Sequence, residues 1–290
     1  MKTLPYNFLG LRPELADYRR ARFAILPIPY DATASYRSGT RFGPSAIITA
    51  SQQVEFFDEE LGTEFHRCGI ATLDPLLPNA AGPQLMHEDI FKYARRVVRD
   101  GKTPIALGGE HSITSGLVRA VAGKHPELSV LQIDAHADLR DAYEGSAYSH
   151  AAAMRRVLEW TEAIVPVGIR NYSREEHRFM QKAGIVPISA RQCQTSDDWL
   201  DLVLERLTDD VYVTIDIDGF DPAYAPGTGT PEPGGFDWYQ VTDLLHLVAA
   251  EKHVVGADVV EVMPLPGSSV TEFLAAKLVY KLICFMQATH

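Results

Sequence analysis

Acidic and imidazole side chains recur at alternate positions in two short segments of the chain. One segment, DAHAD, begins at Asp134, and the other, DIDGFDP, begins at Asp216. Alternate residues of an extended strand share one face, so Asp134 and His136 should point the same way about 6.6 Å apart. The same holds for Asp216 and Asp218. One metal ion matches that spread poorly, whereas two ions about 3.5 to 4 Å apart fit both pairs, so the spacing favours a two-metal site.

Three further residues with metal-binding or charge-pairing side chains belong to the same pattern. His111 lies in GGEHS after the apolar run TPIAL, Glu261 lies in EVMP after VGADVV, and Asp138 closes DAHAD. Asp138 can join the others only if the chain curves as its strand ends. Taken singly, DxHxD could cap a helix, His111 could be a core histidine and Glu261 a salt-bridge partner. Their occurrence together favours a metal site.

Electrostatics supports a bound cation at these positions. Two carboxylates about 4 Å apart repel by about 4 kcal/mol at an effective dielectric constant of about 20, and a cluster of four acids multiplies this cost. Bound cations would turn the repulsion into binding energy. A ligand set rich in carboxylates, with some imidazole and no thiolate, suits manganese or magnesium better than a closed structural zinc site.

Short apolar, β-branched runs alternate with stretches of helical period, and strands that are apolar on both faces indicate a mostly parallel sheet covered on both sides. In such sheets ligands bind at the carboxyl ends of the strands, where the acidic motifs fall. The predicted strands are residues 22–28, 103–109, 128–135, 163–169, 185–189, 211–217 and 254–262. The predicted helices are residues 44–56, 87–99, 113–123, 174–183, 197–207, 237–250 and 269–287.

The composition is that of a globular protein. With 290 residues, 46% of them hydrophobic, we expect one domain over residues 1–290. A net charge of −11 argues against nucleic acid as a partner and favours a cationic small molecule. The sequence shows neither an apolar run of about 18 residues nor a signal-peptide pattern, so we expect no membrane partner and a cytoplasmic location. The three cysteines are far apart and predict neither disulfides nor a thiolate zinc site.

The remaining histidines are expected to be structural or exposed, in helices or loops without acidic partners: His66, His87, His125, His177, His246, His253 and His290. The segment APGTGTPEPGG (225–235) lacks both the ending of a phosphate-binding loop and GxGxxG spacing. We interpret it as a rigid loop that shapes the wall of the metal site.

The ordered motifs together resemble the ureohydrolase family, which includes arginase and agmatinase. The resemblance spans nearly the whole chain, through PYDATASYRSGTRFGPSAI (29–47), GGEHS, DAHAD, TIDIDGFDPAYAPGTGTPEPGG and VVEVMP. It implies a three-layer αβα fold, two manganese ions per chain and a homo-oligomer, since family members are usually trimers or hexamers. The implied ligands of one ion are His111, Asp134, Asp138 and Asp216, and those of the other are Asp134, His136, Asp216 and Asp218, with Asp134 and Asp216 bridging both.

The family resemblance also implies a mechanism for a guanidinium substrate. Delocalised charge deactivates the guanidinium carbon, so attack at neutral pH needs a strong nucleophile, which a hydroxide bridging two metal ions supplies. Asp138 would orient the hydroxide, and Glu261 would hold the guanidinium through charge-assisted hydrogen bonds. His150 resembles the family's proton-shuttling histidine, which would protonate the departing amine. The alternative is that His150 merely begins the helix in SHAAAMRRV.

The loops resemble agmatinases more than arginases. Arginases bind the α-carboxylate and α-amino group of their substrate with an asparagine after DAHxD, an SGN segment, and an acid after the GxR turn. Arg140 stands at the asparagine position, SGN is absent, and Ser173 aligns with the acid. Loss of those contacts favours agmatine, which has no carboxylate, although Arg140 could pair with an arginine carboxylate instead of with Asp141 or Glu144. The roles of loops 140–149 and 171–176 in specificity stay open.

Three alternatives remain at this stage. The substrate could be aminopropylagmatine or guanidinobutyrate, or less readily arginine, depending on the room left by the loops near Tyr143, Tyr148 and Phe220. Metal-dependent deacetylases share the fold in outline, but a single zinc and a catalytic tyrosine would not explain His111 together with the aspartate pairs. A catalytically silent binding protein should have lost a ligand, and the motifs retain all of them.

Overall fold

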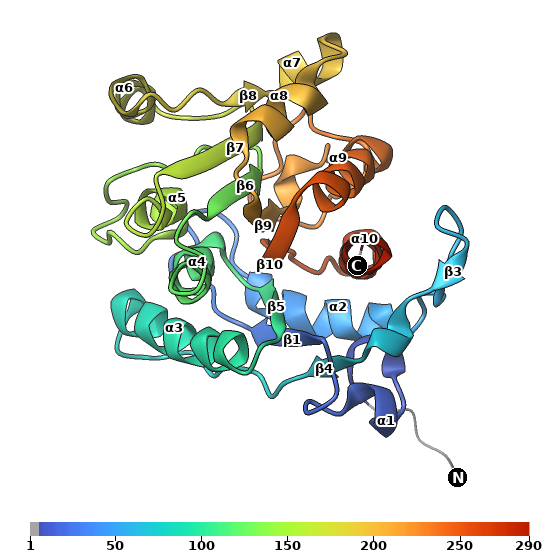
Figure 1. The fold of residues 1–290 in the computed structure, drawn as a ribbon. Coiled ribbons are helices and arrows are strands. Elements are labelled where there is room, and N and C mark those ends of the chain that lie inside the picture. Colours follow the sequence, from blue (N-terminus) through green and yellow to red (C-terminus); the bar gives the residue numbers. More distant parts are fainter. Residues whose placement is uncertain (1–5, 290) are drawn as a thin grey trace.

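Eight strands, every neighbouring pair of them parallel, form one central sheet in the computed structural model, which describes residues 6–289 (Figure 1). The strand order is β4-β1-β5-β10-β9-β6-β7-β8. The strands are β1 Phe23–Ile28, β4 Ile70–Thr72, β5 Thr103–Gly108, β6 Ser129–Ile133, β7 Ala163–Ile169, β8 Ile188–Ser189, β9 Asp210–Asp216 and β10 His253–Val260. A separate antiparallel pair joins β2 Phe57–Asp58 to β3 Thr63–Glu64.

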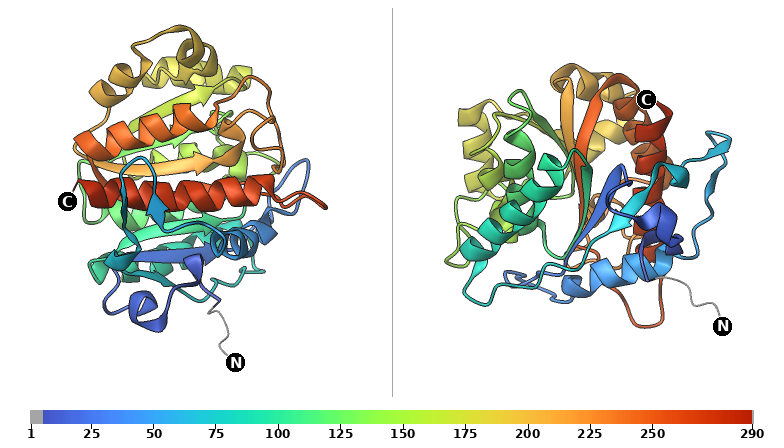
Figure 2. Two further views of the ribbon diagram at one scale, coloured as in Figure 1. Left: turned by 90° about the vertical axis from the view of Figure 1, so that its right-hand side faces the viewer. Right: turned by 60° about the horizontal axis from the view of Figure 1, so that its bottom comes forward.

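Helices cover both faces of the sheet, so the predicted three-layer αβα fold is confirmed (Figures 1 and 2). One core lies under α2 Gly43–Ser51, α8 Trp199–Arg206, α9 Trp238–Glu251 and α10 Val270–Ala288. The other lies under α3 Pro83–Arg99, α4 Thr114–Ala122, α5 Ala153–Val157 and α6 Arg174–Ala183. The remaining α-helices are α1 Pro13–Ala16 and α7 Ala190–Thr195, and the 3-10 helices are η1 Phe8–Gly10, η2 Thr40–Phe42, η3 His66–Cys68, η4 His111–Ile113, η5 His150–Ala152 and η6 Ile217–Gly219.

Strand β9 shows why these apolar runs form buried strands. Val213 and Ile215 pack into the core under α9 and α10, whereas Tyr212, between them and the strand start, packs into the opposite core. All three side chains are fully buried. Burying an aliphatic side chain of this size stabilises the fold by about 1.5 to 3 kcal/mol. The middle of the strand therefore carries apolar residues on both faces, and polar side chains appear toward its end at Thr214 and Asp216.

Helix boundaries follow local signals. Ser173 and Glu176 form a capping box at the start of α6, and Gly184 ends that helix with a left-handed φ of 71°. Helix α10 is buried along most of its length and holds a buried cation, Lys281, whose Nζ lies 3.0 Å from Asp58 and 2.7 Å from Glu60. Pairing with these carboxylates offsets the cost of burying the ammonium group.

Several predicted boundaries differ from the structure. The strand predicted over 128–135 ends at Ile133, and the one predicted over 185–189 is only β8. The short β4 is missing from the prediction because three residues carry too little periodicity. Among residues 6–289, no helix is both long and apolar enough to span a membrane.

Candidate metal centre

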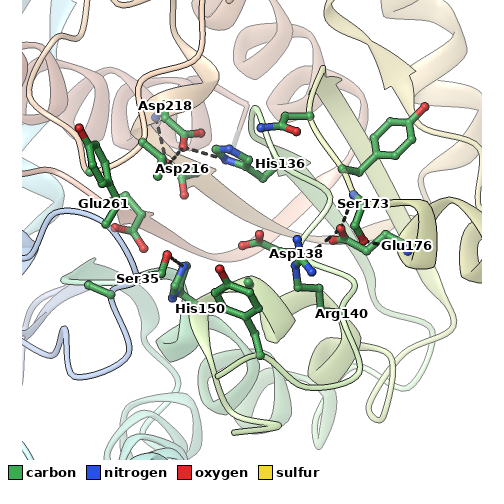
Figure 3. A pocket seen from close by; sticks show the side chains of 18 of the residues that line it. Ser35, His136, Asp138, Arg140, His150, Ser173, Glu176, Asp216, Asp218 and Glu261 are labelled. Atoms are coloured by element: carbon green, nitrogen blue, oxygen red, sulfur yellow. Dashed lines mark hydrogen bonds and ion pairs between the residues drawn. The ribbon is translucent and has the colours of Figure 1, made fainter. Parts of the chain in front are cut away.

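The predicted ligand residues lie at the carboxyl ends of four neighbouring strands. In sheet order, β5, β10, β9 and β6 lead to His111, Glu261, Asp216 and Asp134. Figure 3 shows Asp216, Asp218, His136 and Asp138 pointing toward one another, with Glu261 and His150 at the side of the same cavity. This cavity has a volume of about 160 Å³. The fold thus brings together residues that are up to 150 positions apart in the chain.

One group of ligand atoms surrounds the ring of His111. Its Nδ1 lies 3.2 Å from Asp134 Oδ2, 3.0 Å from Asp138 Oδ2 and 3.5 Å from Asp216 Oδ2. The opposite ring nitrogen, Nε2, lies 2.9 Å from the Thr214 hydroxyl, which donates its own hydrogen to Asp258 Oδ1. Thr214 must then accept from Nε2–H, so the Nδ1 lone pair of neutral His111 faces the carboxylates.

A second group surrounds His136. Its Nδ1 lies 3.0 Å from Asp218 Oδ2 and 3.8 Å from Asp134 Oδ1. Asp134 therefore takes part in both groups, with Oδ2 facing His111 and Oδ1 facing His136. Asp216 belongs to the first group and accepts a hydrogen bond from the Asp218 N–H at 2.9 Å. The geometry fits a bridging role for Asp134 more directly than for Asp216.

Local backbone conformation aims two of these side chains. Asp134 and His136 do not lie on one extended strand as predicted, because β6 ends at Ile133 and the Asp134 side chain accepts the His136 N–H. Asp138 has a φ of 51° and Glu261 a φ of 61°, in the left-handed region that costs a non-glycine residue about 1 to 3 kcal/mol. The chain therefore curves at Asp138, as predicted, and this curve lets the Asp138 side chain reach the other residues of the centre.

The electrostatics of the bare centre is unfavourable. Burial, together with the neighbouring carboxylates, raises the pKa of Asp134 to about 6 and that of Asp216 well above its usual range. Burial alone would lower the pKa of His136, but the charge and hydrogen bond of Asp218 together with the charges of Asp134 and Asp138 outweigh it and raise that pKa to about 10. The Nδ1 of His111 has no hydrogen-bond partner of good geometry. A cation beside the buried carboxyls of Asp134 and Asp216 would therefore favour their charged forms.

The residues present therefore fit two hard divalent ions. Each group combines carboxylate oxygens with one imidazole nitrogen, the donor set that suits manganese. A cation between Nδ1 of His111 and its three facing carboxylates would use the lone pair that Thr214 leaves available. Thr214 and Asp258, which the sequence analysis missed, thereby set the tautomer of a ligand.

A hydrogen-bond network absent from the sequence analysis positions His150. Glu110, fully buried, accepts from the Thr33 N–H and the Thr33 hydroxyl, each at 2.6 Å. Because the Thr33 hydrogen goes to Glu110, its oxygen accepts the His150 N–H at 3.0 Å. The His150 ring then lies with Nδ1 3.4 Å from Thr33 and Nε2 3.3 Å from the Ser35 hydroxyl (Figure 3). His150 begins η5, yet its ring lines the cavity.

A close backbone contact holds the Thr33 loop against this network. The N–H of Glu110 donates to Tyr30 O at 2.7 Å, and Gly109 O accepts the Glu261 N–H at 2.7 Å. A Cβ atom at Gly109 would lie 2.1 Å from the Tyr30 carbonyl oxygen. Only glycine fits there, so GGEHS requires its second glycine for a steric reason.

The cavity rim differs from the predicted one. Arg140 pairs with neither Asp141 nor Glu144, since its Nε lies 3.9 Å from Glu176 and its guanidinium lies over the Tyr143 ring at 4.7 Å. Asp141 instead lies 3.6 and 3.5 Å from two arginines of α5, Arg155 and Arg156. Tyr143 lines the cavity, but Tyr148 packs against His87, and Phe220 is buried in the core. Of these three residues, Tyr143 is the one whose side chain lines the cavity, and the influence of the neighbouring loops on the room for substrate stays a prediction.

Arg170, which the sequence analysis also missed, connects the loop 225–235 to the candidate centre. Arg170 donates to the carbonyl oxygens of Asp218 at 2.6 Å, Glu232 at 2.8 Å and Pro233 at 3.1 Å. Thr230, in the same loop, donates to Asp218 Oδ2 at 3.3 Å. The loop forms part of the cavity wall as predicted.

Two histidines outside the centre also differ from the prediction. His125 and His253 have an acidic partner, because each Nδ1 lies 2.7 Å from Asp210. His253 also begins β10 and lies in neither a helix nor a loop. Spacing along the chain did not reveal this cluster, since its members are 85 and 43 positions apart.

A parallel sheet with acidic and imidazole groups converging at the ends of its central strands defines an α/β protein with a candidate cation site. The model of the arginase family matches residues 21–284, and the chain belongs to this family of ureohydrolases. The N(1)-aminopropylagmatine ureohydrolase of Synechocystis sp. is 42% identical over 93% of this chain and 90% of its own length. The agmatinase of Pyrococcus horikoshii is 36% identical over 98% of both chains.

A solved structure supports the same family assignment. The agmatine ureohydrolase of Thermoplasma volcanium superposes with a TM-score of 0.85 at 34% identity, covering 93% of this chain and 92% of that one. The predicted resemblance to ureohydrolases is thus confirmed. Family membership decides against a metal-dependent deacetylase.

Proposed function

We propose that this chain hydrolyses the guanidinium group of an agmatine-type cation to urea and an amine, using two manganese ions held by His111, His136 and the four aspartates described above. The observation that carries this proposal is the small cavity that the ligand groups share with Glu261 and His150 (Figure 3). When bound, two manganese ions would lower the pKa of water enough for it to attack at neutral pH.

The chain's own residues would bind and orient the substrate. The carboxylate of Glu261, fixed by the His111 N–H at 2.8 Å, would hold the planar guanidinium through charge-assisted hydrogen bonds. Asp138, carried on the curved backbone after DAHA, would orient the attacking water. Since family membership does not test individual residues, these roles are part of the proposal.

His150 would supply the proton that the departing amine needs. Its ring stands at the cavity wall between the hydroxyls of Thr33 and Ser35, at hydrogen-bond or near hydrogen-bond distance from both. An imidazole can both donate and accept a proton and can therefore give and regain one in each turnover. Thr33 and buried Glu110 would keep the ring in place.

Two substrates of this class are favoured by the relatives. N1-aminopropylagmatine is the first choice, because the relative named for it shares 42% identity, against 36% for the agmatinase of P. horikoshii. Agmatine, which the sequence analysis favoured, is the second. Both are guanidinoalkyl amines without a carboxylate, and the acidic group of Glu232, 3.7 Å from His136, suits their positive chains.

Arginine should be a poor substrate. Its carboxylate would lose solvation at the rim, where Arg140 is already engaged with Glu176 and Tyr143. A buried unsatisfied polar group costs about 1 to 3 kcal/mol, which corresponds to about tenfold or greater discrimination.

Urea release from N1-aminopropylagmatine, agmatine, guanidinobutyrate and arginine, measured side by side with manganese, tests the proposal. We expect the highest kcat/KM for N1-aminopropylagmatine, then agmatine, with arginine at least about tenfold lower. Equal rates for arginine and agmatine would contradict the rim interpretation. Absence of urea from all four would contradict the function itself.

We further propose that residues 1–290 act as one ureohydrolase domain, which the one eight-stranded central sheet supports. The homo-oligomer and the cytoplasmic location stay predictions.

A further inference from the structure

A second cluster of side chains that can bind a metal ion lies at the amino ends of the strands, opposite the candidate centre. Asp210 is the first residue of β9, His253 is the first residue of β10, and His125 lies just before β6. These three strands are neighbours in the sheet (Figure 1). Asp210 Oδ2 lies 2.7 Å from His125 Nδ1, and Asp210 Oδ1 lies 2.7 Å from His253 Nδ1. We call these three residues the amino-edge triad.

The amino-edge triad resembles a metal site in its donor geometry. Its ligand atoms all lie within 4.8 Å of one another, and among residues 6–289 the other groups with this property are the two that form the candidate centre. The two imidazole rings are T-shaped at a centroid distance of 6.0 Å, so both Nδ1 atoms can face one point beside the carboxylate. Side-chain exposures of 15%, 31% and 53% leave the triad open to an ion from solvent.

We propose that the amino-edge triad binds one divalent transition-metal ion, with Zn²⁺ as its best match. Two imidazole nitrogens and one carboxylate oxygen are donors that zinc takes at about 2.0 to 2.2 Å, with water completing a tetrahedron. Manganese, magnesium and calcium prefer sets dominated by oxygen. The two edges of the sheet would therefore select different ions.

The backbone around the amino-edge triad is already ordered. The His253 N–H donates to Asp209 O at 2.8 Å, and the Leu128 N–H donates to His125 O at 3.2 Å. Asp210 O accepts from the Thr208 hydroxyl at 3.0 Å. Binding would therefore need only small side-chain movements. The Nδ1 hydrogen that each imidazole donates to Asp210 would move to Nε2 or be released to solvent, so that the Nδ1 lone pair can face the ion.

The position of the amino-edge triad limits what a bound ion can do. Strand β9 carries Asp210 at its first residue and Asp216 at its last, so the two sites are about 20 Å apart along the strand. An ion there would touch no group of the candidate centre. It would instead tie the starts of β6, β9 and β10 together and stabilise the folded protein by mass action.

The test uses the full chain with manganese already bound, equilibrated with buffered free Zn²⁺. Elemental analysis should show one zinc in addition to the manganese, and thermal unfolding should shift upward by roughly 5 °C at zinc about one hundred times Kd. His125→Ala, Asp210→Asn and His253→Ala should each weaken this zinc binding by at least the roughly 10- to 100-fold seen when a supporting group of a metal site is removed. Urea release should be unchanged in all three.

Two controls separate this site from the candidate centre. His177→Ala removes an exposed histidine of α6 and should leave zinc binding intact. Asp218→Ala alters the candidate centre and should keep the zinc of the amino-edge triad. If the three triad variants bind as much zinc as the unaltered chain, or if zinc is lost only in Asp218→Ala, the amino-edge triad is a hydrogen-bonded cluster and no metal site. This outcome does not depend on the proposed ureohydrolase reaction.

Discussion

The two ends of strand β9 hold aspartates in opposite situations. Asp216 is buried among other carboxylates, and burial followed by the charges of Asp218 and Asp134 raises its pKa well above the usual range. Asp210 is partly exposed between two imidazoles. Partial burial works to raise its pKa, but the hydrogen bonds with His125 and His253 outweigh burial and lower it. At its last residue the strand thus joins a cluster in which carboxylates outnumber imidazoles. At its first residue it contributes one carboxylate that two imidazoles contact.

This contrast explains why the two ends should depend differently on metal. At the carboxyl end, four aspartates and Glu261 face three imidazoles, those of His111, His136 and His150, so carboxylates are in excess. At the amino end, one carboxylate faces two imidazoles in contact with water. We therefore expect the first cluster to depend on bound cations and the second to be stable without one.

Removing bound cations should inactivate the cluster at the carboxyl end of β9. Chelation is expected to abolish urea release and manganese to restore it, because the buried acids lose their compensating charge. Asp218→Ala should remove mainly one of two manganese ions, since Asp218 lies in only one ligand group. Elemental analysis and urea assays before and after dialysis check both results. Active protein that holds one zinc and ignores manganese would overturn the assignment.

Glu261→Gln should separate substrate binding from metal binding within the carboxyl edge. Glutamine keeps an acceptor for the His111 N–H at 2.8 Å but removes the charge offered to the guanidinium. We expect unchanged manganese content and a fall in kcat/KM of about 10² to 10³, the usual size for one preorganised electrostatic contact. Loss of an ion, or full activity, would show that Glu261 has a different role.

His150→Asn should lower kcat by about 10² while both ions stay bound, because general acid catalysis contributes at least that factor. Added imidazole should restore part of the rate if proton delivery is the role of His150. Thr33→Val removes the hydroxyl that accepts the His150 N–H and should lower kcat by a smaller factor. Thr33→Ser keeps this hydroxyl and should therefore keep kcat. A His150→Asn variant that imidazole does not rescue would favour a merely structural role.

Short-range patterns made much of the fold and the ligand cluster predictable. Helix α6 matches its prediction because Ser173, Glu176 and Gly184 are local signals. The ligands fall in compact motifs at strand ends, so their convergence followed from the parallel sheet. The direction in which each side chain points did not follow, because the left-handed backbone conformation of Asp138 and Glu261 cannot be recognised from residue spacing.

Contacts between distant segments were outside the reach of sequence patterns. Glu110 meets Thr33 across 77 positions, and His125 meets Asp210 across 85. Each residue alone has an ordinary local context, and only the order of strands in the sheet brings the partners together. The same limit explains why Arg140 was expected beside Asp141 or Glu144 but lies beside Glu176.

The smallest expected effect lies at the amino end and tests its charge balance without metal. In zinc-free solution Asp210→Asn should leave urea release unchanged and lower stability by about 1 kcal/mol, or roughly 2 to 4 °C in Tm, because it weakens the hydrogen bonds of two imidazoles. Since the folded pKa of Asp210 is lowered, its contribution is present above the unfolded value of about 3.9 and is lost as pH falls through the folded pKa. The stability difference between the unaltered chain and Asp210→Asn should therefore persist at about pH 7 and pH 5 and shrink below about pH 4. Denaturant unfolding at these pH values measures it, with His177→Ala as the control; a gap that widened in acid would mean that Asp210 is not the stabilising charge.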